Sequence, residues 1–81
     1  MHIKVLGPGC KNCHTVERNT RTALERLGWD AEVELVTDYA DIAGYGIMKT
    51  PGLVVDEQVV SAGMVPDADA IEKLLRQVRP S

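Results

Sequence analysis

The segment of residues 2–13, HIKVLGPGCKNC, decides the fold because two different periodicities meet inside it. Its first half places Ile3 and Val5 on one face of an extended chain, which predicts a short strand over residues 2–6. Gly7-Pro8-Gly9 follows, and these residue types favour a turn. The first strand is therefore expected to stop just before the two cysteines.

From the second cysteine onward, apolar positions recur at steps of three and four residues, which predicts an amphipathic helix. The stripe consists of Cys13, Val16, Thr20, Ala23, Leu24 and Leu27. Gly28 then supplies a good left-handed cap, so the helix is expected to end there. A loop that leaves the carboxyl end of a strand and opens a helix is the usual place for chemistry on an open α/β sheet.

The middle of the chain continues the alternation of strand and helix. Residues 31–36 predict a second strand, and the alternation of two glutamates with apolar residues indicates an edge position with one wetter face. Thr37 or Asp38 is suited to cap a short second helix, which Gly44 and Gly46 limit in length.

The last third of the chain predicts a hairpin and a final helix. Residues 53–55 and 59–60 are β-branched runs close enough to form an antiparallel hairpin. Asp56 and Glu57 suit a two-residue type I′ turn poorly, so a longer or bulged connection is expected. Asp67 is placed to cap a helix with an apolar stripe. That stripe consists of Ile71, Leu74, Leu75 and Val78.

These elements define an α/β fold with the order β-α-β-α-β-β-α. The long helix between the first two strands requires a parallel crossover, and the hairpin adds antiparallel strands. The expected architecture is a four-stranded mixed sheet with helices on both faces, and residues 1–81 form a single domain.

Composition excludes several classes of function. Twelve acidic and nine basic residues give a net charge of -3, and the basic residues do not cluster as they would on a nucleic-acid surface. No apolar run reaches the ~18 residues needed to span a bilayer, so no membrane partner is expected. No export signal is visible, which favours a cytoplasmic location, and a monomer is expected.

The two cysteines form a C-x-x-C pair, which is a poor structural clamp because it closes a very short loop. Cys10 opens the first helix, where unpaired backbone N–H groups and the helix dipole favour a thiolate, and the charge of Lys11 acts in the same direction. Cys13 follows at i+3 on the same side, so its sulfur can reach that of Cys10. Cys10 is thus the expected nucleophile and Cys13 the buried resolving partner.

The chain resembles the small thioredoxin-like, glutaredoxin-sized redox proteins of bacteria and archaea. The resemblance rests on GPGCKNC after the first strand, YGIMKTPGLVV around the proline and VVSAGMVPD before the last helix, and it covers essentially the whole chain. It implies a thiol–disulfide oxidoreductase that works through a Cys10–Cys13 disulfide without any other cofactor or metal.

The same resemblance implies a substrate-binding groove. Pro51 is expected to be cis and to face the two sulfurs, while the backbone of Thr50 offers hydrogen bonds to an extended substrate segment. Gly63 is expected to border the groove, with Lys11 and Asn12 contributing from the motif itself. The expected partners are disulfide-containing proteins or low-molecular-weight thiols, together with a reductase or a glutathione-type donor.

This sequence departs from the pattern of larger thioredoxins at three places. Gly9 stands where those proteins have Trp, and Lys11-Asn12 replaces Gly-Pro inside the motif. Lys4 occupies the strand position at which they bury an acid. The redox potential and the path of the proton are therefore left open.

Three other interpretations of CKNCH compete with the redox one. His14 completes a haem-attachment pattern, for which only Met48 and Met64 are plausible second ligands, although both are more simply groove or core fillers. A zinc site would need both cysteines with His14 and His2, or a dimer. A non-catalytic dithiol module or metallochaperone that holds a soft metal is the main alternative.

Overall fold

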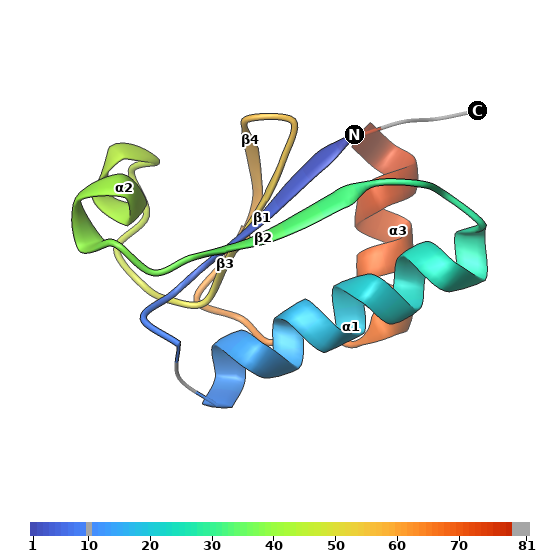
Figure 1. Ribbon diagram of the computed structural model, residues 1–81, viewed down its shortest axis with the longest axis horizontal. Helices are drawn as coiled ribbons and strands as arrows, with labels where there is room; N and C mark the ends of the chain where they lie inside the picture. Colours follow the sequence, from blue (N-terminus) through green and yellow to red (C-terminus); the bar gives the residue numbers. More distant parts are fainter. Residues whose placement is uncertain (10, 79–81) are drawn as a thin grey trace.

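The structure is a computed structural model that describes residues 1–9 and 11–78 (Figure 1). The sequence forms four strands and three helices in the expected order. The elements are β1 (His2–Leu6), α1 (Lys11–Leu27), β2 (Glu32–Val36), α2 (Tyr39–Gly44), β3 (Gly52–Val55), β4 (Gln58–Ala62) and α3 (Ala68–Val78).

The four strands form one mixed sheet in the order β2-β1-β3-β4. β1 pairs in parallel with β2, in a register that places Lys4 opposite Glu34, and pairs antiparallel with β3, where Lys4 lies opposite Val54. β3 and β4 are antiparallel. The predicted α/β architecture and the edge position of β2 are therefore confirmed.

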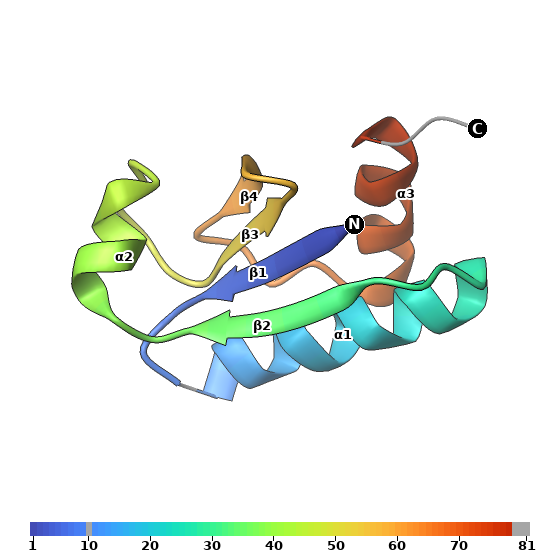
Figure 2. The same cartoon turned by 45° about the horizontal axis from the view of Figure 1, so that its top comes forward.

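Helices lie on both faces of this sheet, as predicted. α1 and α3 pack together on one face, whereas the short α2 lies against the other (Figure 2). The larger core is buried between the sheet and α1 with α3. It contains Ile3, Val5, Val16, Ala23, Leu24, Leu53, Val55, Ile71 and Leu75. The smaller core beneath α2 contains Leu6, Val36, Ile42 and Val54.

Local side-chain contacts begin the two later helices. Asp38 is the N-cap of α2, and its carboxylate accepts a hydrogen bond of 2.8 Å from the backbone N–H of Ala40. Asp67 accepts a bond of the same length from the N–H of Ala70 at the start of α3. Both capping residues were among those expected from the sequence.

The connection between β3 and β4 differs from the expectation. The predicted longer or bulged connection is wrong: Val55 pairs with Gln58, which leaves a turn of only two residues. Asp56 and Glu57 adopt φ angles of 48° and 67°, the left-handed region that a type I′ turn requires. The irregularity lies inside the hairpin instead, between the pairings of Leu53 and Val54.

Contacts with β1 explain why this turn forms without glycine. The backbone N–H of Asp56 donates to the carbonyl of His2 at 2.8 Å, and the Asp56 carboxylate accepts from the N–H of His2 at 2.8 Å. Glu57 forms an ion pair with Lys4. A left-handed conformation costs an ordinary residue roughly 1–2 kcal/mol, and these tertiary bonds offset that cost.

Candidate active site

The first turn of α1 carries the cysteine motif. Cys10 lies outside the described residues, and α1 begins at the next residue, Lys11, with no acidic residue in its first turn. Cys13 has an exposed fraction of 0% and belongs to the buried side of the helix. The expectation that Cys13 is buried is confirmed, and the redox roles of the two cysteines are taken up below.

Gly7, at the end of β1, provides the wall against which Cys13 packs. A Cβ added to Gly7 would overlap Cys13 Sγ and would lie 3.1 Å from Cys13 Cβ. The same position is 3.9 Å from Thr50 Cβ, so Gly7 lies between the motif and the proline loop. The backbone N–H of Gly7 donates to the carbonyl of Val36 at 2.9 Å, which fixes this wall to the end of β2.

The proline loop lies next to the segment that follows β4. The Thr50–Pro51 peptide bond is cis, the isomer that the family resemblance implies, with Pro51 buried and Thr50 exposed. The backbone N–H of Gly63 donates to the carbonyl of Pro51 at 2.9 Å. Gly63 adopts a φ of 74°, which favours glycine, and a Cβ there would lie 2.9 Å from Lys49 Cβ. Cys13, Thr50, Pro51 and Gly63 are thus brought to one edge of the molecule.

Lys11 and Asn12 occupy the exposed side of the first turn of α1. Within residues 1–9 and 11–78, no hydrogen bond or ion pair connects either side chain to Thr50 or Gly63. His14 is also exposed, and its Nδ1 lies 3.8 Å from Glu17 Oε1. These three side chains therefore lie on the exposed side of α1, whereas Cys13 lies on its buried side.

Lys4 lies on the α2 face of the sheet, where it joins three distant parts of the chain. Its Nζ donates to the Tyr45 hydroxyl at 2.6 Å and to Glu57 Oε1 at 2.8 Å, and it lies 5.4 Å from the centre of the Tyr45 ring. The hydrogen bonds to Glu57 and Tyr45 raise the pKa of Lys4 above its ordinary value of 10.5. The bond from Lys4 lowers the pKa of Glu57 below 4.5. Lys4 is therefore positively charged at neutral pH.

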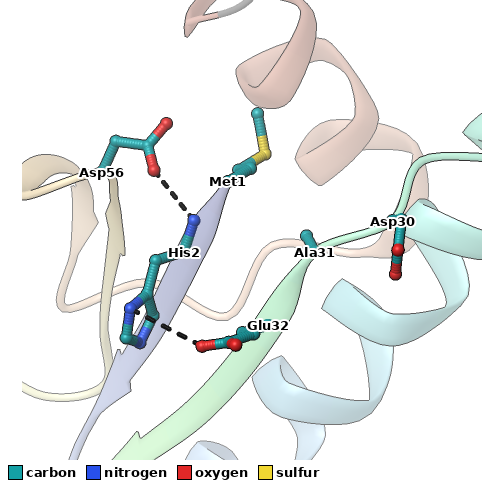
Figure 3. A pocket seen from close by; sticks show the side chains of 6 residues that line it. All are labelled: Met1, His2, Asp30, Ala31, Glu32 and Asp56. Atoms are coloured by element: carbon teal, nitrogen blue, oxygen red, sulfur yellow. Dashed lines mark hydrogen bonds and ion pairs between the residues drawn. The ribbon is translucent and has the colours of Figure 1, made fainter.

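A separate pocket lies at the other end of β1, away from Gly7 and Cys13 (Figure 3). It is lined by Met1, His2, Asp30, Ala31, Glu32 and Asp56. The His2 ring lies 3.2 Å from Glu34 and 4.0 Å from Glu32. Because β1 separates His2 from the motif by roughly 13–16 Å at the usual rise of a strand, His2 cannot join Cys13 in a zinc site.

Metal ligands do not gather elsewhere in the described part of the chain. Over residues 1–9 and 11–78, no three His, Cys, Asp or Glu side chains are grouped so that they could hold a metal ion. Over the same residues, no helix has the length and apolar character needed to cross a bilayer.

Met48 and Met64 are not core residues. Met48 has an exposed fraction of 98% and Met64 of 67%, so the expectation that they fill the core is wrong, and a place beside the substrate groove stays a prediction. Sequence reasoning also missed the contact between Gly7 and Cys13, because it treated Gly7 only as part of a turn. The signal was the position of that glycine at the carboxyl end of the strand that leads to the motif.

Comparison with known proteins agrees with this geometry. A family model for the thioredoxin domain matches residues 1–76. The thioredoxin of Methanothermobacter thermautotrophicus is 39% identical over 75 residues, which cover 93% of this chain and 97% of that protein. The thioredoxin of Methanocaldococcus jannaschii is 36% identical over 74 residues, which cover 91% of this chain and 85% of that protein. This chain therefore belongs to the thioredoxin family of thiol–disulfide oxidoreductases.

Proposed function

We propose that the protein exchanges thiols and disulfides through a Cys10–Cys13 dithiol, with Cys10 as the nucleophile and Cys13 as the resolving residue. The observation that carries this assignment is the burial of Cys13 against Gly7, on the side of α1 that faces the sheet. A buried sulfur is shielded from an external disulfide but remains available to a sulfur bound one helical turn earlier.

The setting of Cys10 in the sequence supports its role as the attacking group. It immediately precedes a helix of 17 residues that has no acidic residue in its first turn and carries Lys11 as its first residue. Unpaired N–H groups and the positive end of the dipole stabilise an anion at such a position. The thiolate is the reactive form of cysteine.

The proposed exchange proceeds in two balanced steps. The Cys10 thiolate attacks one sulfur of a partner disulfide and forms a mixed disulfide with it, while the partner's S–S bond breaks and its other sulfur leaves as a thiolate and takes up a proton. Cys13 then loses its proton and attacks Cys10, the mixed disulfide breaks, and the partner sulfur that was bound to Cys10 leaves in the same way. The partner gains two electrons and two protons, and the protein holds a Cys10–Cys13 disulfide. The two sulfurs carry all of the chemistry, so no other cofactor or metal is required.

Thr50, Pro51 and Gly63 are proposed to hold the partner while these bonds exchange. Their support is position: Thr50 lies next to the Gly7 wall, and Gly63 is hydrogen-bonded to Pro51. Lys11 and Asn12 flank the approach. The partners are disulfide-containing proteins or low-molecular-weight disulfides, and a reductase or a glutathione-type thiol restores the dithiol. A reducing compartment such as the cytoplasm suits this cycle.

Single cysteine variants test the two roles directly. Cys10→Ser should abolish the reduction of a protein disulfide such as that of insulin, whereas Cys13→Ser should accumulate a mixed disulfide that mass spectrometry detects. The alkylation of Cys10 in the reduced protein should have a pH midpoint below about 8. Full turnover by Cys10→Ser would refute the assignment. Stoichiometric binding of copper(I) without turnover by the wild type would favour the metallochaperone alternative instead.

Substitution at Gly7 tests whether the position of Cys13 matters for the second step. In Gly7→Ala the new methyl group would overlap Cys13 Sγ and displace it, so release of the partner from the mixed disulfide should slow at least tenfold. Gly44→Ala is the matched control, because a Cβ there meets no atom within 4 Å. Stopped-flow measurement of the two steps separates attack from release. Equal release rates in the two variants would show that the contact is not needed.

A further inference from the structure

Two neighbouring loops at the active-site edge, within residues 46–51 and 62–66, expose apolar side chains that belong to neither hydrophobic core. Of the large apolar residues exposed in residues 1–9 and 11–78, three lie on these loops: Met48 at 98%, Met64 at 67% and Val65 at 44%. The loops are adjacent, because Gly63 is hydrogen-bonded to Pro51 and abuts Lys49. Apolar surface gathered beside a reactive group is typical of an interaction site.

The same edge is positively charged although the chain as a whole is acidic. Residues 7–15, 46–51 and 62–66 contain Lys11 and Lys49 but no Asp or Glu, whereas the whole chain carries a net charge of -3. The carboxylates that directly follow the first and the third of these segments are already engaged. Glu17 pairs with Arg21, and Asp67 caps α3.

Lys49 is available to a partner. Within the described residues, no ion pair involves Lys49 or Lys11, whereas Lys4, Arg26 and Arg76 all contact carboxylates. The stem of Lys49 lies along Gly63, since a Cβ on that glycine would be 2.9 Å from Lys49 Cβ and 3.3 Å from its Cδ. This contact holds the side chain at the junction of the two loops, and Lys49 is exposed.

We propose that Met48, Lys49 and Met64 form a docking surface that selects polypeptide partners with an apolar and an acidic side chain next to the reactive cysteine. This proposal rests on the proposed function and names the partner class that the site prefers. Flexible thioether side chains adapt to varied apolar surfaces, and the lysine supplies charge complementarity. A small disulfide would leave most of this apolar surface uncovered.

Matched peptides test the charge preference. Each of two peptides contains one cysteine in a mixed disulfide with a chromophoric thiol, and the peptides differ only in carrying Glu or Lys beside that cysteine. The reduced full-length protein is added, and the release of the chromophoric thiol measures the rate. The Glu peptide should react about fivefold faster at low salt, and the ratio should approach one at about 1 M salt, where the Debye length is about 3 Å. Lys49→Glu should invert the preference. Lys73→Glu, which changes an exposed lysine on α3, should leave it unchanged.

A second peptide pair tests the apolar preference. Peptides with Leu or Ser on the other side of the cysteine should differ about threefold in rate, and the combined change Met48→Ala with Met64→Ala should remove that difference. Val59→Ala is the matched control, because Val59 is also exposed but lies on β4. Circular dichroism verifies that each variant is folded.

The outcomes separate failure of the docking surface from failure of the enzyme. The neutral small disulfide 4,4′-dithiodipyridine reports on the reactive sulfurs alone. If it is reduced while Lys49→Glu keeps the wild-type peptide ratio, the docking surface is refuted and the oxidoreductase assignment stands. Faster reaction with oxidised glutathione than with any peptide would also overturn the polypeptide assignment. Loss of reaction with every disulfide would refute the proposed function itself.

Discussion

The two faces of the sheet are stabilised in different ways. On the face covered by α1 and α3, nine buried residues form a continuous apolar core, and the alternation of Ile3 and Val5 places both of them in it. On the other face, the six-residue α2 contributes Ile42 to a cluster of only four buried apolar residues. The area beside it is occupied by Lys4 with Tyr45 and Glu57. A short helix cannot cover a whole sheet face, so a polar network completes what apolar burial leaves open.

Truncation in the larger core should have the greatest effect on stability. Ile71 on α3 is completely buried, so Ile71→Ala should reduce the free energy of unfolding by about 2–5 kcal/mol. That is a large share of the roughly 5–15 kcal/mol expected for a whole domain. Urea denaturation measures the change. A loss below about 1 kcal/mol would mean that α3 contributes little to the core.

Truncation of the smaller core should lower the free energy of unfolding by less. Ile42 is the buried residue of that helix, and Ile42→Ala should cost about 2 kcal/mol, at the lower end of the usual range, because the surrounding helix is short and can relax toward solvent. The same urea measurement compares it with Ile71→Ala. A larger loss at Ile42 than at Ile71 would reverse the ranking of the two faces.

The polar network should appear as a pH dependence of stability, and its effect should be the smallest. Because the bond from Lys4 lowers the pKa of Glu57, its contribution is full above the unfolded-state value near 4.5 and is lost as the pH falls through the lowered folded-state value. Lys4, whose pKa is raised, contributes fully below 10.5 and loses its contribution only at still higher pH.

Glu57→Gln should therefore flatten the acid side of the stability curve. Between about pH 6 and pH 3 the wild type should lose more stability than this variant, as thermal unfolding at several pH values will show. Glu25→Gln, which changes an exposed glutamate of α1, is the control and should follow the wild type. Parallel curves for the wild type and Glu57→Gln would mean that the ion pair with Lys4 does not stabilise the fold.

This contrast also explains what the sequence could predict. The larger core follows from periodicity, because the stripe from Cys13 to Leu27 and the alternation in β1 are local patterns. The caps at Asp38 and Asp67 are equally local. The network of Lys4 could not be predicted, since its partners lie 41 and 53 residues away along the chain.

The hairpin turn shows the same limit. Local preference argues against Asp56 and Glu57 at left-handed positions, and tertiary bonds to His2 and Lys4 override that preference. The cysteine motif could be recognised from its spacing at the start of a helix. The cis Thr50–Pro51 bond could be anticipated only from the family resemblance. The exposure of Met48 could not, because an isolated methionine has the same pattern in a core and on a surface.

The bare backbone of Gly7 has a consequence for how this protein tolerates change. Mutagenesis that shortens side chains cannot detect its contact with Cys13, since there is nothing to remove; only enlargement can. Substitution of Gly7 by any larger residue should therefore be poorly tolerated, whereas the neighbouring Pro8 is exposed and should tolerate substitution better. The smallest residue at the carboxyl end of β1 sets how closely the backbone can approach the sulfur of Cys13.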